Sequence, residues 1–259
     1  MITDSGVDAA WSVAREAALR AGVEVRELQS SEIAIAQEVI GAVWGPQQVP
    51  QSNLLRAFAH AGSTLLGALV GDQPVGTTLG FVGWEGGMHL HSHMTAVIPS
   101  RISGGVGYAL KLWQRAVCLR EGVGEVRWTY DPLVARNAQF NLVKLGAAVM
   151  AMHPNFYGAM DDIVNVGDES DRFEVSWRLD SPRVVAALAG RPLRPTDVVR
   201  SHAIPEDYTT LSRTDPAAAR AARVATRDAV LAAERDGLAI EWDGGSYRFT
   251  RPAPEPTDG

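Results

Sequence analysis

The chain has 259 residues, of which 46% are hydrophobic and 21% charged, and its formal net charge is −6 at pH 7. This length suffices to bury one large core or two modest ones, and the negative charge argues against a nucleic-acid partner, because proteins that bind nucleic acid usually carry a basic face. No apolar run approaches the ~20 residues that span a bilayer, and no apolar segment of a signal peptide lies near the start. We therefore expect a cytoplasmic protein with no nucleic-acid or membrane partner.

The patterns of the first 84 residues alternate between the periodicities of helices and strands. They predict helices over 5–21 (ending at Gly22), from Ser30 or Ser31 to about residue 43, and from Ser52. Strands are predicted over 23–28, 64–70 and 76–84, the last two joined by a turn at 71–74.

Residues 88–98 alternate so as to predict a strand with two differently used faces. His89, His91 and His93 share one face, and Pro99 should end the strand because it cannot donate to a ladder. Neighbouring histidines on this face would lie roughly 6.6 Å apart, which suits proton relay through water. Two other interpretations stay open here: a polar face whose histidines bond to neighbours, or part of a metal site that lacks a further close ligand.

A loop of small residues follows and leads into a helix predicted over 105–121, with Gly122 as its C-cap. A strand, a glycine-rich turn and a helix start can form an anion site, because free N–H groups and the helix dipole favour phosphate there. The spacing of Gly104, Gly105 and Gly107 fits neither the dinucleotide fingerprint nor the P-loop. Alternatively, the glycines serve only to pack strand and helix closely. The same helix carries Cys118, the single cysteine, which we expect to be an inert buried thiol.

The next segments continue the alternation of strands and helices. A strand is predicted over 125–130 and a helix over 133–145, with Asp131 as N-cap, Pro132 at the first position and Gly146 after the end. Strands over 147–152 and 173–179 complete the order β-α-α-β-β-β-α-β-α-β-β. Asn141 and Lys144 are predicted at the surface.

Several of these segments resemble the GNAT (Gcn5-related N-acetyltransferase) superfamily, whose fold the predicted element order matches. Its motif A, R/Q-x-x-G-x-G/A, aligns with 102–107, where both glycines match and Ile102 replaces the usual Arg or Gln. Residues 91–97 are similar to the H-x-H-x-x-x-V stretch of arylalkylamine N-acetyltransferases. Residues 136–146 are similar to motif B, with Leu142 in place of its Tyr. The chain also carries the strings SHM, WT[FY]DP, RNAxFNLxKLGA and NFYG of one GNAT subgroup.

The resemblance implies an α/β (α+β) fold with a mixed, mostly antiparallel sheet of six or seven strands flanked by helices. It implies acetyl-CoA or another acyl-CoA as co-substrate, with no metal. The residues that it assigns to this co-substrate are Ala96 and Val97 for the pantetheine arm, Ser103, Gly104, Gly105, Val106, Gly107 and Tyr108 for the pyrophosphate, and Asn137, which either holds an amide of the co-substrate or faces solvent.

The resemblance also implies a direct transfer of the acyl group to an amine. His91 and His93 would remove the amine proton through water. Tyr157 is a candidate for the acid that is missing at Leu142, since a phenol can return a proton to a thiolate; the alternative is a packing aromatic. We expect a small-molecule amine or an amino acid as acceptor, an acetyl or larger acyl group such as succinyl, and possible homodimers. A non-catalytic module that binds CoA or a partner protein is the alternative, which Ile102 and Leu142 favour.

The predicted domain organisation has three parts: an N-terminal helix in 1–22, the catalytic domain in 23–180 and an extension in 181–259. The extension begins with residues 181–212, which show no sustained period. A helix over 215–235 and a hairpin over 238–250 follow, and the tail from 252 is predicted to be mobile. Arg220, Arg223 and Arg227 form a stripe on this helix that we interpret as a solvated face. Because a helix and a hairpin make too small a core, we expect the extension to pack on the preceding domain.

Overall fold

The helices and strands up to residue 180 follow the predicted order, and the computed structural model describes residues 3–158 and 169–252. The helices are α1 (Asp4–Ala21), α2 (Ile33–Trp44), α3 (Ser52–His60), α4 (Val106–Arg120), α5 (Ala135–Ala138), α6 (Pro182–Leu188), α7 (Tyr208–Thr214) and α8 (Pro216–Arg235). A π-helix, Gln139–Lys144, continues α5, and short 3-10 helices lie at Pro46–Gln48 and Pro99–Arg101. The strands are β1 (Glu24–Glu27), β2 (Leu65–Val70), β3 (Gln73–Gly83), β4 (His89–Val97), β5 (Glu125–Tyr130), β6 (Ala148–His153), β7 (Arg172–Arg178), β8 (Val198–Ala203), β9 (Ala239–Asp243) and β10 (Ser246–Thr250).

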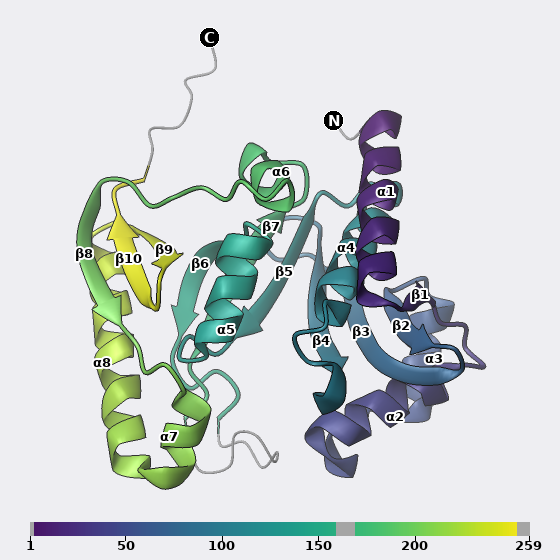
Figure 1. The fold of residues 1–259 in the computed structure, drawn as a ribbon, viewed down its shortest axis with the longest axis horizontal. Coiled ribbons are helices and arrows are strands. Elements are labelled where there is room, and N and C mark those ends of the chain that lie inside the picture. The colour runs from purple at the N-terminus through teal and green to yellow at the C-terminus, as the bar shows by residue number, and fades with distance from the viewer. Residues whose placement is uncertain (1–2, 159–168, 253–259) are drawn as a thin grey trace. The chain divides into compact units, whose positions relative to one another are not determined.

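Seven strands form a mixed sheet in the order β1-β2-β3-β4-β5-β7-β6, and three form a second sheet in the order β8-β10-β9 (Figure 1). Neighbours from β1 to β4 are antiparallel, as are β6 and β7, whereas β4 and β5 are parallel. The predicted fold class, an α/β (α+β) fold around a mixed and mostly antiparallel sheet, is therefore confirmed.

The chain divides into two compact units at the middle of β5. Of the described residues, the first unit contains those up to Trp128 and 178–180, and the second contains the others after 128. The extension that we predicted to begin at residue 181 shares the second unit with the motif B segment. The three-part domain organisation itself remains a prediction.

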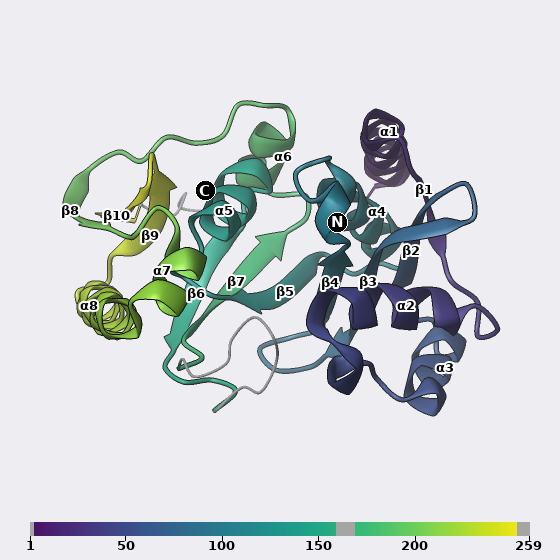
Figure 2. The ribbon, with the colours of Figure 1, turned by 60° about the horizontal axis from the view of Figure 1, so that its bottom comes forward.

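In the first unit, helices cover both faces of the sheet (Figure 2). α2 and α3 lie on one face, around a core of Leu28, Ile33, Ala36, Leu55, Leu65 and Leu79. α4 packs on the other face and α1 packs on α4. Gly76 of β3 permits the close approach of α4, because a Cβ there would lie 2.8 Å from Val106 Cγ1 and 3.0 Å from Leu110 Cδ1.

In the second unit, large aromatic side chains fill the core, namely Trp177, Tyr247, Phe173 and Phe249. The Tyr247 hydroxyl donates to Pro132 O at 2.6 Å, and Arg183 pairs with Glu241 at 2.6 Å. These contacts tie the hairpin of β9 and β10 to segments that precede it in the chain. The predicted hairpin, with its turn at Gly244–Gly245, is confirmed, and the predicted tail lies outside the described residues from 253 onward.

The interpretation of 181–212 as irregular was wrong, because this segment contains α6, β8 and α7. The two helices begin at local caps, where Ser181 accepts a hydrogen bond from Val184 N and Asp207 accepts one from Thr210 N. β8 obtains its hydrogen bonds from β10, more than 40 residues away in sequence, and is exposed along most of its length. An exposed edge strand carries no alternating pattern to predict it from.

Two predicted helix starts were also wrong. α2 begins after Glu32 rather than at a serine cap, and the Glu32 carboxylate accepts from Gln29 N at 2.9 Å. The helix predicted from 133 begins at Ala135, since Asp131 accepts from Leu133 N in a turn and does not cap the helix. The turn between β2 and β3 is tighter than predicted, since it contains only residues 71 and 72. None of the described helices is long and apolar enough to cross a membrane.

The amine of Lys111, on α4, is enclosed in the first unit without a carboxylate partner among the described residues. Its Nζ donates to Ser92 Oγ at 2.8 Å and lies 3.9 Å from the centre of the Trp128 ring. The ring face attracts an ammonium, but complete burial disfavours the charge more strongly and lowers the pKa of Lys111 from its ordinary 10.5 to about 7. Burial likewise raises the pKa of Cys118 to about 12, so the predicted inert thiol is confirmed.

We expect Lys111→Met to remove a pH dependence of stability. Between about pH 7 and 10.5 the unfolded chain holds a proton that the folded amine does not, so the wild type gains stability as pH rises, by up to about 1.4 kcal/mol per pH unit. The Met variant lacks this slope, so its free energy of unfolding should exceed that of the wild type most at pH 7 and below. Urea unfolding at pH 6, 8 and 9.5 measures this free energy, and Lys144→Met, at an exposed lysine, is the control. Equal pH slopes in wild type and Lys111→Met would contradict the expectation.

Candidate functional site

β4 loses its β5 partner after the third of its nine residues. It pairs with β3 over almost all of its residues, but with β5 only at Leu90 and His91. Ile98 N donates to Val75 O of β3 at 3.0 Å, and because backbone groups alternate along a strand, the N–H and C=O of Val97 point away from β3. Beyond His91, β4 therefore offers a strand edge that no other described strand covers. An extended ligand arm could pair with it.

This edge leads directly into the glycine turn. Ser103 (φ 69°) and Gly105 (φ 85°) adopt left-handed conformations, and Gly105 is the N-cap of α4 without a capping side chain. Gly104 N donates to Arg101 O, whereas the N–H groups of Gly105, Val106 and Gly107 donate to no acceptor within the described residues. Free N–H groups at the start of a 15-residue helix are suited to an anion.

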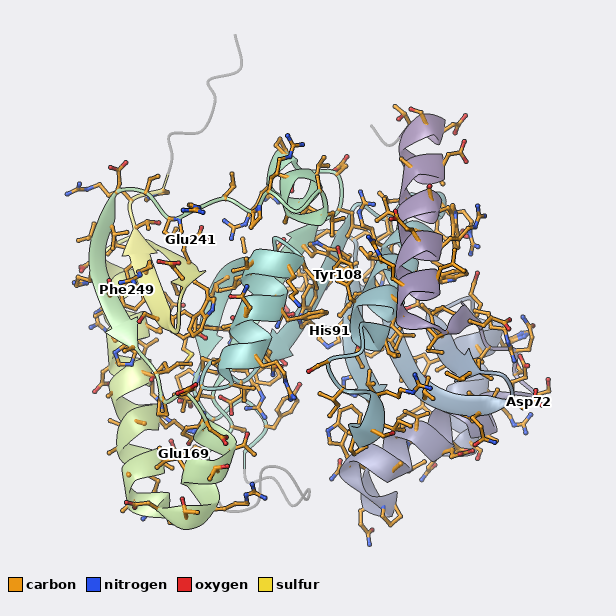
Figure 3. All side chains as sticks on the ribbon, viewed as in Figure 1. Asp72, His91, Tyr108, Glu169, Glu241 and Phe249 are labelled. Atoms are coloured by element: carbon orange, nitrogen blue, oxygen red, sulfur yellow. The ribbon has the colours of Figure 1, made fainter. Side chains whose placement is uncertain are left out.

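The other residues predicted to bind the co-substrate differ in how far their side chains are buried. The side chains of Ala96 and Val106 are buried in the core, so only their main-chain groups could meet a ligand. Tyr108 lies half-buried on the first turn of α4 (Figure 3), and burial raises the pKa of its phenol. The helix predicted over 105–121 is confirmed as α4.

His91 and His93 of β4 lie on the same face of the sheet as the aromatic side chain of Phe81 on β3. Their ring centres lie 6.0 Å apart, and the Phe81 ring lies 5.2 Å from the first and 5.8 Å from the second. Phe58 stacks on Phe81 at 5.5 Å. The spacing agrees with the sequence prediction. Phe81 was not singled out, although it lies directly opposite His91 across the β3–β4 pair.

His89 does not join this pair. Its ring is buried against Gly83, where a Cβ would lie 2.6 Å from Nε2, and its Nδ1–H donates to Gly87 O at 2.9 Å. Within the described residues no three His, Cys, Asp or Glu side chains are grouped so as to hold a metal ion. His89 is therefore a packing residue at the start of β4.

Burial favours the neutral form of the His93 imidazole. Although His93 is exposed as a residue, burial of its ring beside its neighbours lowers its pKa below the ordinary 6.5. At neutral pH the ring of His93 is therefore unprotonated and able to accept a proton.

Tyr157 and Asn137 belong to the second unit. The Tyr157 hydroxyl lies 3.0 Å from Thr129 Oγ1, and its half-exposed ring packs edge-on against Phe156 at 4.7 Å. Asn137 is partly exposed on α5. Their cooperation with the histidines and the glycine turn remains a prediction.

Two sequence interpretations in this unit were wrong or incomplete. Asn141, predicted at the surface, is 4% exposed, as is Leu142, whereas Lys144 is exposed as predicted. Arg223 and Arg227 do not form a solvated face, because both are bound to carboxylates of distant segments. Sequence reasoning missed these ion pairs, since the partners lie far away in the chain.

No protein-family model matches the sequence, and no curated protein matches it either. Among solved structures, the chain is similar to the ribosomal-protein-S18-alanine N-acetyltransferase from Escherichia coli, with a TM-score of 0.49 and 12% identity over 61% of this chain and 95% of that one. It is similar to Ard1 from Thermoplasma volcanium, with a TM-score of 0.48 and 18% identity over 60% of this chain and 96% of that one. It is also similar to an acetyltransferase of the GNAT family from Streptococcus pneumoniae, with a TM-score of 0.49 and 10% identity over 60% of this chain and 97% of that one. The fold class of this chain is defined by its own strand order.

Gly107→Ala tests whether an anion approaches the helix start. A Cβ at Gly107 would lie 3.7 Å from Val97 Cγ2, an ordinary contact, and alanine favours the helix over glycine. We expect an unchanged or higher melting temperature, but CoA affinity lower by about 10-fold, a loss of about 1.4 kcal/mol, because the methyl group blocks the N–H groups. Calorimetry measures the affinity. Gly124→Ala, where the added Cβ meets nothing within 4 Å, is the control. Unchanged CoA affinity in Gly107→Ala would exclude the site.

Gly105→Ala is less informative, because its φ of 85° strains any L-residue whether or not a ligand binds.

Proposed function

We propose that the protein is an acyl-CoA-dependent N-acyltransferase. The observation that supports this best is the continuity of the uncovered β4 edge with the free N–H groups at the start of α4. An acyl-CoA has an extended arm with amide groups, followed by a pyrophosphate. The Val97 edge suits the arm and the N–H groups of Gly105 to Gly107 suit the pyrophosphate. Asn137 would hold an amide of the arm.

In the proposed reaction, an amine attacks the thioester carbonyl, the C–N bond forms and the C–S bond breaks. The acceptor arrives as an ammonium and must first lose a proton, which His91 and His93 would accept through water. The departing thiolate would take a proton from the Tyr157 phenol, and the second proton that the nitrogen loses as the amide forms would restore the phenol. One proton is thus released overall, through the histidines. The acceptor is a small-molecule amine or an amino acid, and the acyl group is acetyl or a larger one such as succinyl.

A non-catalytic module that binds CoA or a partner protein is the second candidate. Two observations favour it: Ile102 presents an exposed apolar side chain where motif A usually has Arg or Gln, and Leu142 is buried where motif B usually has Tyr. Release of free thiol from acetyl-CoA and succinyl-CoA with a panel of amines separates the candidates. Thiol release that depends on an amine supports the enzyme; CoA binding without release supports the module.

We expect His91→Ala and His93→Ala each to slow acyl transfer, by about 10²-fold if general-base assistance has its usual size. The loss should shrink at high pH, where the acceptor amine is already deprotonated. Because the pKa of His93 is lowered, the acidic limb of the kcat/KM profile should lie below pH ~6.5 in the wild type.

The controls keep this test specific. His60→Ala, an exposed histidine on α3, should have wild-type rates, and CoA affinity should stay unchanged in all three variants. An intact acidic limb in the double variant of His91 and His93 would rule the pair out as the base.

For Tyr157→Phe we expect a lower kcat with little change in KM, because the phenol would act only as the thiolate leaves. The variant loses the hydroxyl contact with Thr129 but keeps the ring packing on Phe156. Steady-state kinetics at saturating acyl-CoA provide the measurement. A wild-type kcat would show that the thiolate departs without this acid.

A further inference from the structure

The segment that carries Tyr157 is held by the residues that precede β7. Asn155 N donates to Asp171 Oδ1 at 2.9 Å, Phe156 N to Ser170 O at 3.0 Å, and Tyr157 N to Ser170 Oγ at 2.8 Å. Asn155 has a φ of 46°, a left-handed conformation that is uncommon outside glycine. Asparagine is among the few residues that adopt this conformation readily, and the three hydrogen bonds hold the turn in place.

Asp171 is in turn bound by an arginine of α8. The carboxylate is fully buried, and Arg227 donates to both of its oxygens, from Nε at 2.9 Å and from Nη2 at 2.8 Å. Arg227 also pairs with Glu169. Hydrogen bonds to Asp171, followed by those to Glu169, raise the pKa of the guanidinium. A bidentate pair fixes orientation as well as distance.

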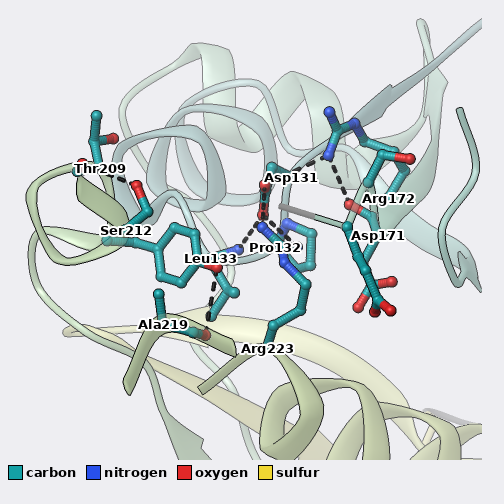
Figure 4. Close-up of polar contacts among 12 residues, drawn as sticks. Asp131, Pro132, Leu133, Asp171, Arg172, Thr209, Ser212, Ala219 and Arg223 are labelled. Carbon is teal, nitrogen blue, oxygen red and sulfur yellow. Dashed lines mark hydrogen bonds and ion pairs between the residues drawn. The ribbon is translucent and has the colours of Figure 1, made fainter. Parts of the chain in front are cut away.

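A second arginine of α8 reaches the same region from one helical turn earlier (Figure 4). Arg223 donates to Asp131 Oδ2 at 2.9 Å, and Arg172 lies 3.4 Å from the same oxygen. Arg172 also donates to Asp171 O at 2.9 Å, and its guanidinium lies 5.5 Å from the centre of the Tyr157 ring. The ion pairs of α8 are therefore connected to both the backbone and the ring of Tyr157.

We propose that α8 positions Tyr157 for proton return to the thiolate, with Arg227 as the positioning residue. This inference rests on the proposed function of Tyr157. Arg227 fixes the Asp171 carboxylate, the carboxylate fixes the Asn155 N–H, and the resulting turn sets the direction of the phenol. A displaced acid loses much of its effect, since misplacement by about 1 Å can cost about 10²-fold in rate. The extension thus contributes to catalysis without touching a reactant.

The test compares Arg227→Met, Arg227→Lys and a matched control, Arg220→Met, an exposed arginine of the same helix. For Arg227→Met we expect kcat to fall about 10-fold or more, with CoA affinity unchanged and faster hydrogen exchange at the amides of Asn155 and Tyr157. Arg227→Lys should recover part of the rate, because an ammonium can still pair with one oxygen of Asp171. Arg220→Met should equal the wild type in all measurements.

A double-mutant cycle separates positioning from general stability. In the Tyr157→Phe background, Arg227→Met should cause little further loss of kcat, since both changes remove the same contribution. Additive losses, or unchanged amide exchange at residues 155 and 157 in a folded Arg227→Met, would overturn the proposal. If Arg227→Met does not fold, Arg227→Lys carries the same comparisons.

The failure of the proposed function has a different signature. If Tyr157→Phe has the wild-type kcat while Arg227→Met still accelerates exchange at the two amides, Tyr157 is not the acid and the catalytic part of the inference falls with it. If Tyr157→Phe lowers kcat while Arg227→Met changes neither amide exchange nor kcat, Tyr157 is supported as the acid and the positioning role of α8 is excluded.

Discussion

The pairing of β4 with β5 ends after His91, and the candidate site depends on this one constraint. Backbone N–H and C=O groups must form hydrogen bonds with a strand, with water or with a ligand. The uncovered edge around Val97 can therefore hydrogen-bond an extended polar ligand. Lys111 bonds to Ser92, the residue at which the pairing has just ended, and rests on Trp128 of β5. Its side chain therefore fills the place where the two strands stop pairing.

Two basic side chains beside β4, on opposite faces of the sheet, have pKa values shifted in the same direction. Burial lowers the pKa of Lys111 on the α4 side and that of His93 beside Phe81, so both side chains tend toward the neutral form near pH 7. An anion at the start of α4 would meet the free N–H groups and the helix dipole. The guanidinium groups of Arg20 and Arg115 also lie close enough to act on the Tyr108 phenol of the same helix turn.

Local signals predicted most of the fold and, within the candidate site, the spacing of the histidine pair and the helix after the glycine turn. Gly22 and Gly146 have the positive φ expected after helix ends, and the histidine spacing follows from the strand repeat alone. The misses at Arg223, Arg227 and β8 share a cause: their partners are remote in sequence. Arg223 and Arg227 look solvated from their spacing, yet their carboxylates lie 92 and 56 residues away. β8 depends on β10 in the same way. Asp131 is a residue type that often caps helices, but its carboxylate is paired with two arginines, Arg172 and Arg223.

Those arginines also explain why a helix late in the chain can matter to a turn near β6. Buried ion pairs give little net stability, because the charges must be desolvated, and apolar side chains of similar size often stabilise a core as well. An ion pair differs from an apolar contact in its directionality: a bidentate guanidinium accepts one orientation of a carboxylate. Removing Arg227 would leave Asp171, which is fully buried, without its main partner, at a cost of roughly 3–5 kcal/mol. Such an expensive contact beside Asn155 and Tyr157 is better understood as a means of fixing geometry than as a source of stability.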